Sequence, residues 1–400
     1  MAAEPDGPWK DWVPGVLNNV QLTNLCEKGL ITGKSLAGLR EAIGLSSIDL
    51  SLSDEGYELV DGAVKPVGPD AYDWFIKNHG LAKQLEKSDP EGYTLKSGKT
   101  YVFRLNENLD RRLADAGIYG QATAKSSVGR VDVLARLIVD GMDTYEGFDP
   151  EGLDRRCGNL YLEITPITFD VKVKADIKLS QLRLFYGRPE NVEIRGPEVF
   201  KTIFRGAGQR DGTLSVDLTN VKEGTLEVAA FCSHRGRSVE PIPLWKKDVR
   251  PDPCKHWKFI TATSAKRLKI EDTKFYILRS KETLAVPRGI AVYCRASDET
   301  IGEMRIHYAG FAHPLFGRER TDGRVGTPLI FEVRGHQVNV SLADGEKMAN
   351  IILYRMSEDC SVPDKKDKPY EEQTLKLSDF FAKWPDKLKK MDEDGTVEPA

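Results

Sequence analysis

The stretch YVFRLNENL at residues 101–109 carries the pattern Y-x2-R-x2-E-x-L, and YILRSKETL at residues 276–284 repeats it. The two copies are 175 residues apart (276 − 101). Apolar and polar residues alternate along both stretches, which is typical of a strand with one buried face. The chain therefore carries the same strand twice, and this repetition decides how the rest of it is interpreted.

Two further pairs of positions repeat at nearly the same distance. A glutamate in a strand-like run precedes an amide side chain by 18 residues in both halves: Glu163 and Gln181 (181 − 163), and Glu332 and Asn350 (350 − 332). The two glutamates are 169 residues apart (332 − 163), and SIDLS at 47–51 matches SVDLT at 215–219 with an offset of 168 (217 − 49). We interpret the chain as a duplicated module of about 170 residues, a usual domain length.

The remaining pattern is mainly β. Short runs rich in Val, Ile, Tyr and Phe, bounded by Gly, Pro and Asp, predict many short strands and favour a barrel or sandwich in each copy. Helical spacing is confined to residues 13–31, 72–87 and 373–388. Three segments follow from this division: a first repeat over 1–190, a second over 191–356 and a tail over 357–400.

Composition excludes several classes of protein. The 400 residues are 40% apolar and 30% charged, which is ordinary for a globular chain too long for one core. A formal net charge of −3 argues against nucleic acid or an anionic membrane as a partner. No secretory signal or long apolar run is visible, and six scattered cysteines suggest a reducing compartment, so we expect a cytoplasmic protein.

Two short Cys-x-His pairs raise the question of zinc. Cys232 and His234, and Cys254 and His256, stand two residues apart, whereas zinc sites usually combine C-x2-4-C with H-x3-5-H. We expect these pairs to be structural or incidental and predict no zinc.

The loop KSSVGR at residues 125–130 is the first candidate for substrate binding. Ser126, Ser127 and Gly129 permit a tight turn with exposed backbone N–H groups, which suits an anion. Arg130 adds a planar fork of donors that matches phosphate oxygens, and Lys125 adds a second cation. Taken alone, such a turn is common on protein surfaces.

A glutamate inside an apolar strand is the second candidate. Glu163 lies in LYLEI at 160–164, where it either faces solvent or sits in a pocket with a raised pKa, ready for proton transfer. Glu332 recurs in LIFEV at 329–333. Because two copies would not both need a carboxylate there for solubility, the repetition favours a functional role.

The order S-x-D-L, K-S-S-x-G-R, G-x-L-Y-x-E and L-x-Q-L-R resembles the deoxycytidine triphosphate (dCTP) deaminases of the dUTPase superfamily, in their two-domain bacterial form. The stretches at 275–287 and 301–311 add to the resemblance, which runs from about residue 14 to residue 381. It implies two tandem dUTPase-like β-barrels with a few short helices. It also implies hydrolysis of dCTP to dUTP and ammonia.

The resemblance implies roles for individual residues. Glu163 matches the catalytic glutamate, and Ser126, Ser127 and Arg130 match the triphosphate and active-site loop. Other positions are implied to contact the nucleotide: Lys125, Gly129, Asp49, Gln181, and Lys368, Tyr370 and Gln373 of the tail, which resembles a segment that closes over the nucleotide but carries one inserted residue.

The chemistry of the reaction fits these assignments. Attack at C4 of cytosine requires an activated water and a proton on N3, and Glu163 could accept the first proton and deliver it to the ring and the leaving amine. Ser126 would hold the water or the exocyclic amine, and Arg130 would support developing charge and phosphate. Zinc deaminases use H-x-E with P-C-x-x-C, and no C-x-x-C occurs here. We therefore expect no metal at the base and Mg²⁺ only on the triphosphate.

The second repeat departs from the pattern. Its counterpart of the serine loop, residues 295–302, contains Asp298 and Glu299, which would repel phosphate, and His313 stands where the family pattern has an aspartate. We expect the first repeat to provide the phosphate loop. Glu332 either completes a composite pocket or is vestigial.

Assembly and alternative functions complete the predictions. Superfamily sites lie between barrels related by threefold symmetry, so we expect a homo-oligomer, with a trimer favoured. One alternative is a dUTP diphosphatase or bifunctional enzyme, for which Asp149 in GFDP at 147–150 would aim the water. Another is a non-catalytic nucleotide-binding regulatory protein.

Overall fold

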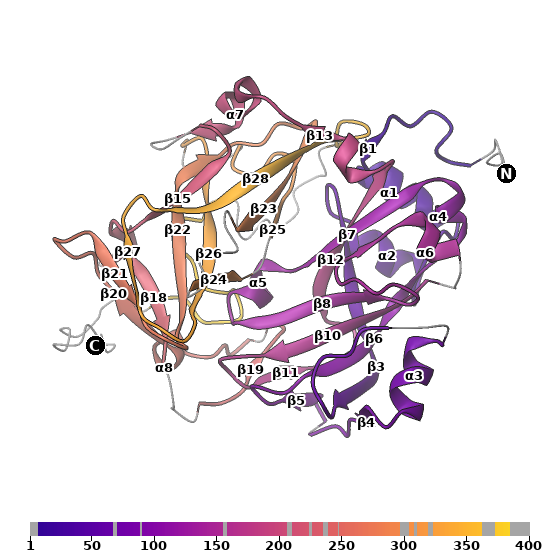
Figure 1. The fold of residues 1–400 in the computed structure, drawn as a ribbon, viewed down its shortest axis with the longest axis horizontal. Helices are drawn as coiled ribbons and strands as arrows, with labels where there is room; N and C mark the ends of the chain where they lie inside the picture. The colour runs from indigo at the N-terminus through magenta and orange to yellow at the C-terminus, as the bar shows by residue number, and fades with distance from the viewer. Residues whose placement is uncertain are drawn as a thin grey trace.

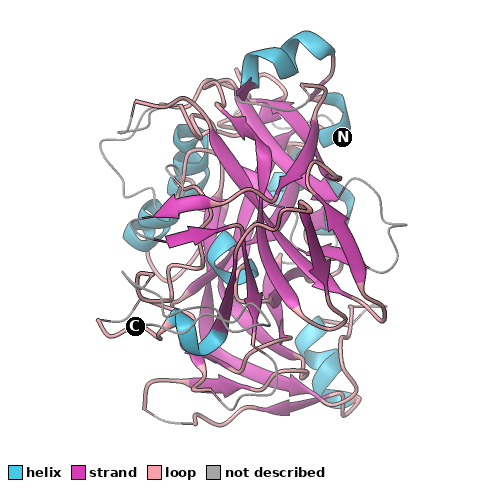
Figure 2. Cartoon of the chain, turned by 90° about the vertical axis from the view of Figure 1, so that its left-hand side faces the viewer, coloured by secondary structure: helices cyan, strands magenta, loops and turns pink. Residues whose placement is uncertain are grey.

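The computed structural model describes residues 7–66, 70–88, 90–154, 158–205, 210–223, 226–234, 239–246, 248–296, 304–307, 310–318, 323–361 and 373–384. Two large antiparallel sheets, one per repeat, stand side by side, with the short helix α5 (Ser126–Gly129) between them (Figure 1). Helices are short and lie mostly around the sheets (Figure 2). The predicted mainly-β architecture of two barrel-like domains is confirmed.

The first sheet contains most strands of the first repeat. Its main path is β8-β10-β6-β3-β12-β7-β9, with β1, β2 and β4 attached at its sides. The bounds are β1 Gly15–Val16, β2 Ile31–Thr32, β3 Ile48–Leu59, β4 Ala82–Gln84, β6 Tyr101–Leu109, β7 Ile118–Ala124, β8 Val133–Val139, β9 Gly147–Phe148, β10 Asn159–Pro166 and β12 Lys178–Tyr186.

The second sheet repeats this order strand for strand. Its path β24-β26-β22-β15-β28-β23-β25 corresponds to the path of the first sheet, and β18 and β20 take the places of the second half of β3 and of β4. The bounds are β13 Glu193–Ile194, β14 Phe204–Arg205, β15 Thr213–Asp217, β18 Ala230–Ser233, β20 Trp257–Ile260, β22 Phe275–Leu284, β23 Ile290–Ala296, β24 Met304–His307, β25 Gly310–Ala312, β26 Thr327–Gly335 and β28 Lys347–Arg355.

Smaller sheets and short helices join these strands. The small strands are β5 Tyr93–Leu95, β11 Val171–Val173, β16 Val221–Glu223, β17 Leu226–Val228, β19 Ile242–Pro243, β21 Arg267–Ile270 and β27 Val340–Ala343. The helices are α1 Asn19–Glu27, α2 Leu36–Ala42, α3 Tyr72–Asn78, α4 Arg112–Asp115, α5 Ser126–Gly129, α6 Pro150–Asp154, η1 Pro189–Asn191, α7 Pro197–Ile203 and α8 Pro253–His256. In the described chain, no helix is both long and apolar enough to cross a membrane.

Strand registers confirm the central equivalence of the two repeats. Tyr101 on β6 pairs with Ile164 on β10, and Tyr276 on β22 pairs with Val333 on β26. Both glutamates therefore occupy the residue before that partner, at the same place in the same strand. The pattern Y-x2-R-x2-E-x-L marks one strand, used twice.

The proposed match between Asp49 and Asp217 is wrong. Asp49 pairs with Gln181, whereas the residue that pairs with Asn350 is Thr213. The true landmark is a serine: Ser51 donates from its backbone N and its hydroxyl to Glu107, and Ser215 does the same to Glu282. Glu107 and Glu282 are the glutamates of the repeated pattern Y-x2-R-x2-E-x-L. Their hydrogen bonds to the serine explain why a glutamate recurs at this position.

The core is shared between the repeats and the end of the chain. Phe231 and Trp257 of the second repeat pack into the same buried cluster as the first repeat. Residues near the C-terminus join this cluster: Leu375, Leu377, Phe380 and Phe381. The described part of the predicted 373–388 helix forms bends and turns instead, because its apolar side chains insert into a core that already exists.

Candidate functional site

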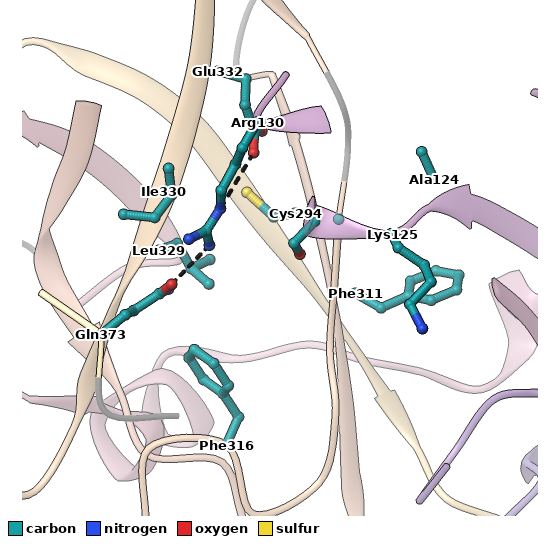
Figure 3. Close-up of a pocket in the computed structure, with 12 residues that line it drawn as sticks. Ala124, Lys125, Arg130, Cys294, Phe311, Phe316, Leu329, Ile330, Glu332 and Gln373 are labelled. Carbon is teal, nitrogen blue, oxygen red and sulfur yellow. Dashed lines mark hydrogen bonds and ion pairs between the residues drawn. The ribbon is translucent and has the colours of Figure 1, made fainter. Parts of the chain in front are cut away.

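A pocket opens where the first repeat's serine loop meets the second repeat's sheet (Figure 3). Its empty volume is about 590 Å³, a figure that includes the open space at its mouth. Side chains and backbone of both repeats and of the C-terminal segment line it: Ala124, Lys125, Ser126, Arg130, Cys294, Gly310, Phe311, Phe316, Leu329, Ile330, Glu332 and Gln373.

Arg130 lies at the centre of this pocket. The loop forms one helical turn, α5, in which the Arg130 backbone N donates to the Ser126 carbonyl over 3.1 Å. The Val128 side chain anchors the turn in the core, fully buried. The turn thereby points the guanidinium away from its own repeat and toward the second one.

The Arg130 guanidinium contacts three separate segments. Its Nη2 donates to Gln373 Oε1 over 2.7 Å, and its Nη1 donates to the Lys376 carbonyl over 3.0 Å. Its Nε lies 4.0 Å from Glu332 Oε1, and Figure 3 shows the side chain between Glu332 and Gln373. A single arginine thus connects the first repeat, the second repeat and the tail.

Glu332 provides the one carboxylate among the lining residues. It projects from β26 and is 5% exposed. Burial raises the pKa of Glu332 to about 8, and the positive charge of Arg130 opposes that rise. A buried carboxyl group with a pKa near neutrality, facing a cavity, has the properties of a general acid/base.

Glu163, the predicted acid/base, lies elsewhere. It is absent from the residues that line the pocket, although it is 1% exposed. Its Oε1 accepts hydrogen bonds from Nε and Nη2 of Arg136, and its Oε2 accepts one from the Tyr145 hydroxyl over 2.8 Å. The Arg136 guanidinium also stacks 4.0 Å from the centre of the Tyr145 ring. Within one chain the structure does not bring Glu163 and Arg130 together.

The other loop residues are placed around the pocket. Ser126 and Lys125 line it, whereas the Ser127 carbonyl accepts a hydrogen bond from the Ser378 hydroxyl over 2.7 Å, and Gly129 is buried in the turn. Lys125 Nζ also pairs with Asp49 Oδ2, so Asp49 acts on the pocket through this lysine.

The remaining predicted contacts are more distant. Gln181 lies on β12 opposite Asp49 and Thr123, outside the pocket lining. Asp149 is exposed, and its Oδ1 accepts the Gly152 N–H over 3.0 Å at the start of α6. Lys368 and Tyr370 fall outside the described residues.

Gln373 lines the pocket, and its side-chain amide bonds to protein groups there. Its Oε1 accepts from Arg130, and its Nε2 donates to the Pro328 carbonyl over 2.9 Å. The amide therefore braces the arginine against the start of β26.

The donor set does not suit zinc. His256 contacts two backbone carbonyls, of Asp252 and Glu240, and burial lowers its pKa. Within the described ranges, no group of three or more Cys, His, Asp or Glu is arranged to hold a metal ion. The pocket offers two cations and one carboxylate, which fit an anionic ligand better than a bare cation.

Sequence reasoning missed the apolar wall and one polar group. Phe311, Phe316, Leu329 and Ile330 line the pocket, and Cys294 lies beside Glu332, where burial and then that carboxylate raise the thiol pKa to about 12. Ile330 lies two residues before Glu332, so alternation in the strand could have indicated it, whereas Leu329 is out of phase with that alternation. His313 bonds the next carbonyl and packs its ring edge-on against Phe316, while the acidic counterpart loop at 297–300 falls outside the described residues.

Comparisons with known proteins agree over nearly the whole chain. Residues 13–188 match the 2'-deoxycytidine 5'-triphosphate deaminase (DCD) N-terminal domain family, and residues 199–381 match the DCD C-terminal domain family. The crystal structure of 2'-deoxycytidine 5'-triphosphate deaminase from Agrobacterium tumefaciens is similar, with a TM-score of 0.75 and 26% sequence identity. That match covers 87% of this chain and 97% of the other chain. No curated protein matched this chain.

Proposed function

This chain belongs to the two-domain dCTP deaminase family, and from that premise we propose that it hydrolyses dCTP to dUTP and ammonia in the pocket between its two repeats. One observation carries the proposal: Arg130 of the first repeat and Glu332 of the second face each other in one pocket with Ser126 and Lys125. The pocket contains a fixed cation for a nucleotide phosphate or oxyanion and a buried acid for proton transfer.

The assignment of the acid/base follows from this geometry. The resemblance points to Glu163, but its carboxylate is held by Arg136 and Tyr145 away from the serine loop. The equivalent residue of the other repeat, Glu332, lines the pocket. We therefore assign the acid/base role to Glu332, and the role of Glu163 stays a prediction to be tested beside it.

The reaction can be written on these groups. Glu332 in its ionised form accepts a proton from water as the oxygen adds to C4, and the same proton passes to N3 of the ring. The exocyclic amine then leaves as ammonia, taking a second proton from the hydroxyl that has been added, so dCTP and water give dUTP and ammonia. A pKa near 8 lets one carboxyl group act in both directions at neutral pH.

The other lining residues have supporting roles. Ser126 lines the pocket, where its hydroxyl would hold the water or the exocyclic amine, and Arg130 would stabilise negative charge as it develops. The apolar wall excludes water from around the base. Mg²⁺ would be held by phosphate oxygens of the substrate, since the lining offers it only the Glu332 carboxylate.

Product analysis tests the proposal. The full-length chain, incubated with dCTP and Mg²⁺, is expected to release ammonia and dUTP in equal amounts, measured by enzyme-coupled ammonia detection and anion-exchange chromatography. Ammonia release should be lost in Glu332→Gln. A protein that releases only dUMP and pyrophosphate from dUTP, or that binds dCTP without releasing ammonia, would contradict the proposal.

A further inference from the structure

A second ion pair lies directly beside the first. Asp132 stands two residues after Arg130, and Arg334 stands two residues after Glu332. Nη2 of Arg334 forms an ion pair with Oδ2 of Asp132. Two ion pairs therefore join the loop of the first repeat to the strand of the second. The loop provides the cation of the first pair and the anion of the second, and the strand provides the opposite charges.

The Asp132 carboxylate is held from several directions. It is fully buried, and its Oδ2 also accepts the Thr168 hydroxyl, which in turn accepts a hydrogen bond from Arg334 Nη2. Arg334 Nη1 donates to the Thr273 carbonyl over 2.7 Å. The contact thus connects the first repeat's loop to both β26 and the start of β22.

Backbone geometry makes this contact relevant to Arg130 and Glu332. In a strand, residues two apart project from the same face, so Glu332 and Arg334 both point toward the first repeat while Val333 packs into the second repeat's core. Asp132 has φ 58°, in the left-handed region that aspartate tolerates better than most residues. That turn ends the Arg130 loop and begins β8.

The strand of the first repeat that carries Glu163 has no counterpart of Arg334. The position equivalent to Arg334 in the first repeat is Thr165 (334 − 169), whose hydroxyl donates to Thr100 over 3.0 Å. The strand that carries Glu163 therefore has no cation at this place. The arginine of this second ion pair is therefore found beside Glu332, the glutamate that faces the serine loop, and not beside Glu163.

Stability alone is a weak explanation for the pair. A buried ion pair often contributes little net stability because both charges lose water. Here Oδ1 of Asp132 and Nε of Arg334 are buried without a hydrogen-bond partner among the described residues, so desolvation is not fully compensated. Burial also lowers the pKa of Arg334 to about 10.

We propose that Asp132 and Arg334 are positioning residues that fix the loop of Arg130 against the strand of Glu332, and so set the distance between the two groups that act on the nucleotide. The consequence for catalysis rests on the function proposed above. The geometric consequence, the approach of Arg130 to Glu332, does not.

The kinetic test uses Asp132→Asn and Thr168→Val. Asparagine keeps the shape and tolerates the same backbone angle, so the loop can still fold. A misplacement of about 1 Å can lower a rate by about 100-fold, so we expect kcat for dCTP to fall about 10- to 100-fold in Asp132→Asn with KM changed less than about 3-fold. Thr168→Val should show a smaller loss of kcat.

A matched control separates positioning from general damage. Asp217 pairs with Arg279 in the second repeat over 2.6 Å, outside the pocket lining. Asp217→Asn should lower the melting temperature while leaving kcat unchanged. Equal loss of kcat in Asp217→Asn and Asp132→Asn would overturn the proposal.

A titration decides the geometry without any activity. The Glu332 carboxyl carbon can be followed by ¹³C NMR and assigned by its absence in Glu332→Gln. The charged groups around it are Arg130 and Lys125 from the loop and the neighbouring pair of Asp132 and Arg334. The neutral Cys294 thiol faces it from β23, and position 307 on β24 pairs with it in the strand register. Arg130 lowers the Glu332 pKa, so its displacement in Thr168→Val, a substitution that changes no charge, should raise that pKa.

The two readouts distinguish two failures. If the wild-type chain releases no ammonia from dCTP but the Glu332 pKa rises in Thr168→Val, the proposed function fails and the positioning role stands. If the Glu332 pKa in Thr168→Val equals that of the wild type, the positioning role is refuted whether or not the chain is a deaminase.

Discussion

Glu163 and Glu332 occupy the same place in the same strand of the two repeats, yet their surroundings differ. Glu163 accepts hydrogen bonds on both oxygens, from a guanidinium on one and from a phenol hydroxyl on the other. Glu332 has Arg130 at 4.0 Å and a cavity before it, and burial holds its pKa near 8. The comparison teaches that duplication preserved the residue twice, whereas among the described residues it is Glu332 and not Glu163 that lines the pocket.

The difference originates in the partners and not in the strand. Register places Arg136 beside Glu163, and position 307 beside Glu332. The serine loop of the first repeat reaches across to the second repeat's strand. A site built in this way needs both repeats, which is a physical reason for the chain to keep them fused.

The arginines give the largest expected contrast. Arg130→Met should lower kcat by about 10²- to 10³-fold, because it removes a charge aimed at the reacting groups. Arg136→Met should leave kcat within about 3-fold. It should instead lower the free energy of unfolding by about 1–3 kcal/mol, because the buried Glu163 loses its partner. Steady-state ammonia release and urea denaturation measure the two effects.

If Arg136→Met lost activity as severely as Arg130→Met while remaining folded, the two sites would not be functionally different. The comparison would then be broken, and the Glu163 environment would have to be treated as part of the catalytic machinery.

The pH dependence of stability tests the raised pKa of Glu332. The folded pKa of Glu332 is raised to about 8 from an ordinary value of 4.5, so its contribution to stability is present below about pH 4.5 and is lost as the pH rises through about 8. The wild type should therefore become less stable relative to Glu332→Gln between these values. Urea denaturation at half-unit pH intervals measures this difference, and a constant difference across the range would contradict the raised pKa.

The tail contact should have an intermediate effect. Gln373→Leu removes the acceptor of Arg130 Nη2 and the donor to the Pro328 carbonyl. We expect kcat to fall about 10-fold, since Arg130 keeps the Lys376 carbonyl and Glu332 as partners. Thr374→Val, one residue along the same segment, is the control and should retain kcat. Unchanged kcat in Gln373→Leu would show that the contact between the tail and Arg130 does not contribute to catalysis.

The smallest expected effect concerns the serine–glutamate hydrogen bond that both repeats share. Ser51→Ala and Ser215→Ala each remove one hydroxyl bond to the repeated glutamate, from Ser51 to Glu107 and from Ser215 to Glu282. Each should lower the free energy of unfolding by about 1 kcal/mol, without changing kcat. Chemical denaturation of both variants measures it, and a severalfold difference between them would show that the repeats have diverged outside the pocket as well.

Much of the fold could be predicted from the sequence. The alternation of apolar and polar residues predicts the strands, and the repeated spacing predicts the duplication. The repeated strand at 101–109 and 276–284, and the equivalence of the two glutamates, follow from those signals. The match of Asp49 to Asp217 failed because a four-residue motif does not fix a register, whereas the buried serine–glutamate bond does.

The site was less accessible to sequence reasoning. Ser126, Arg130 and Gln373 could be identified, but their partner depended on which repeat's strand the loop would reach. The contact between Asp132 and Arg334 joins residues about two hundred positions apart (334 − 132), with no local pattern to pair them. Contacts across two repeats are set by how the sheets pack, and spacing along the chain does not encode that packing.

The most direct measurement compares Glu332→Gln with Glu163→Gln in single-turnover deamination of dCTP by folded, purified protein. The account predicts that Glu332→Gln slows the chemical step by about 10²- to 10⁴-fold, as expected for loss of a general acid/base, while Glu163→Gln stays within about 3-fold of the wild type. Full activity in Glu332→Gln together with loss of turnover in Glu163→Gln would contradict it.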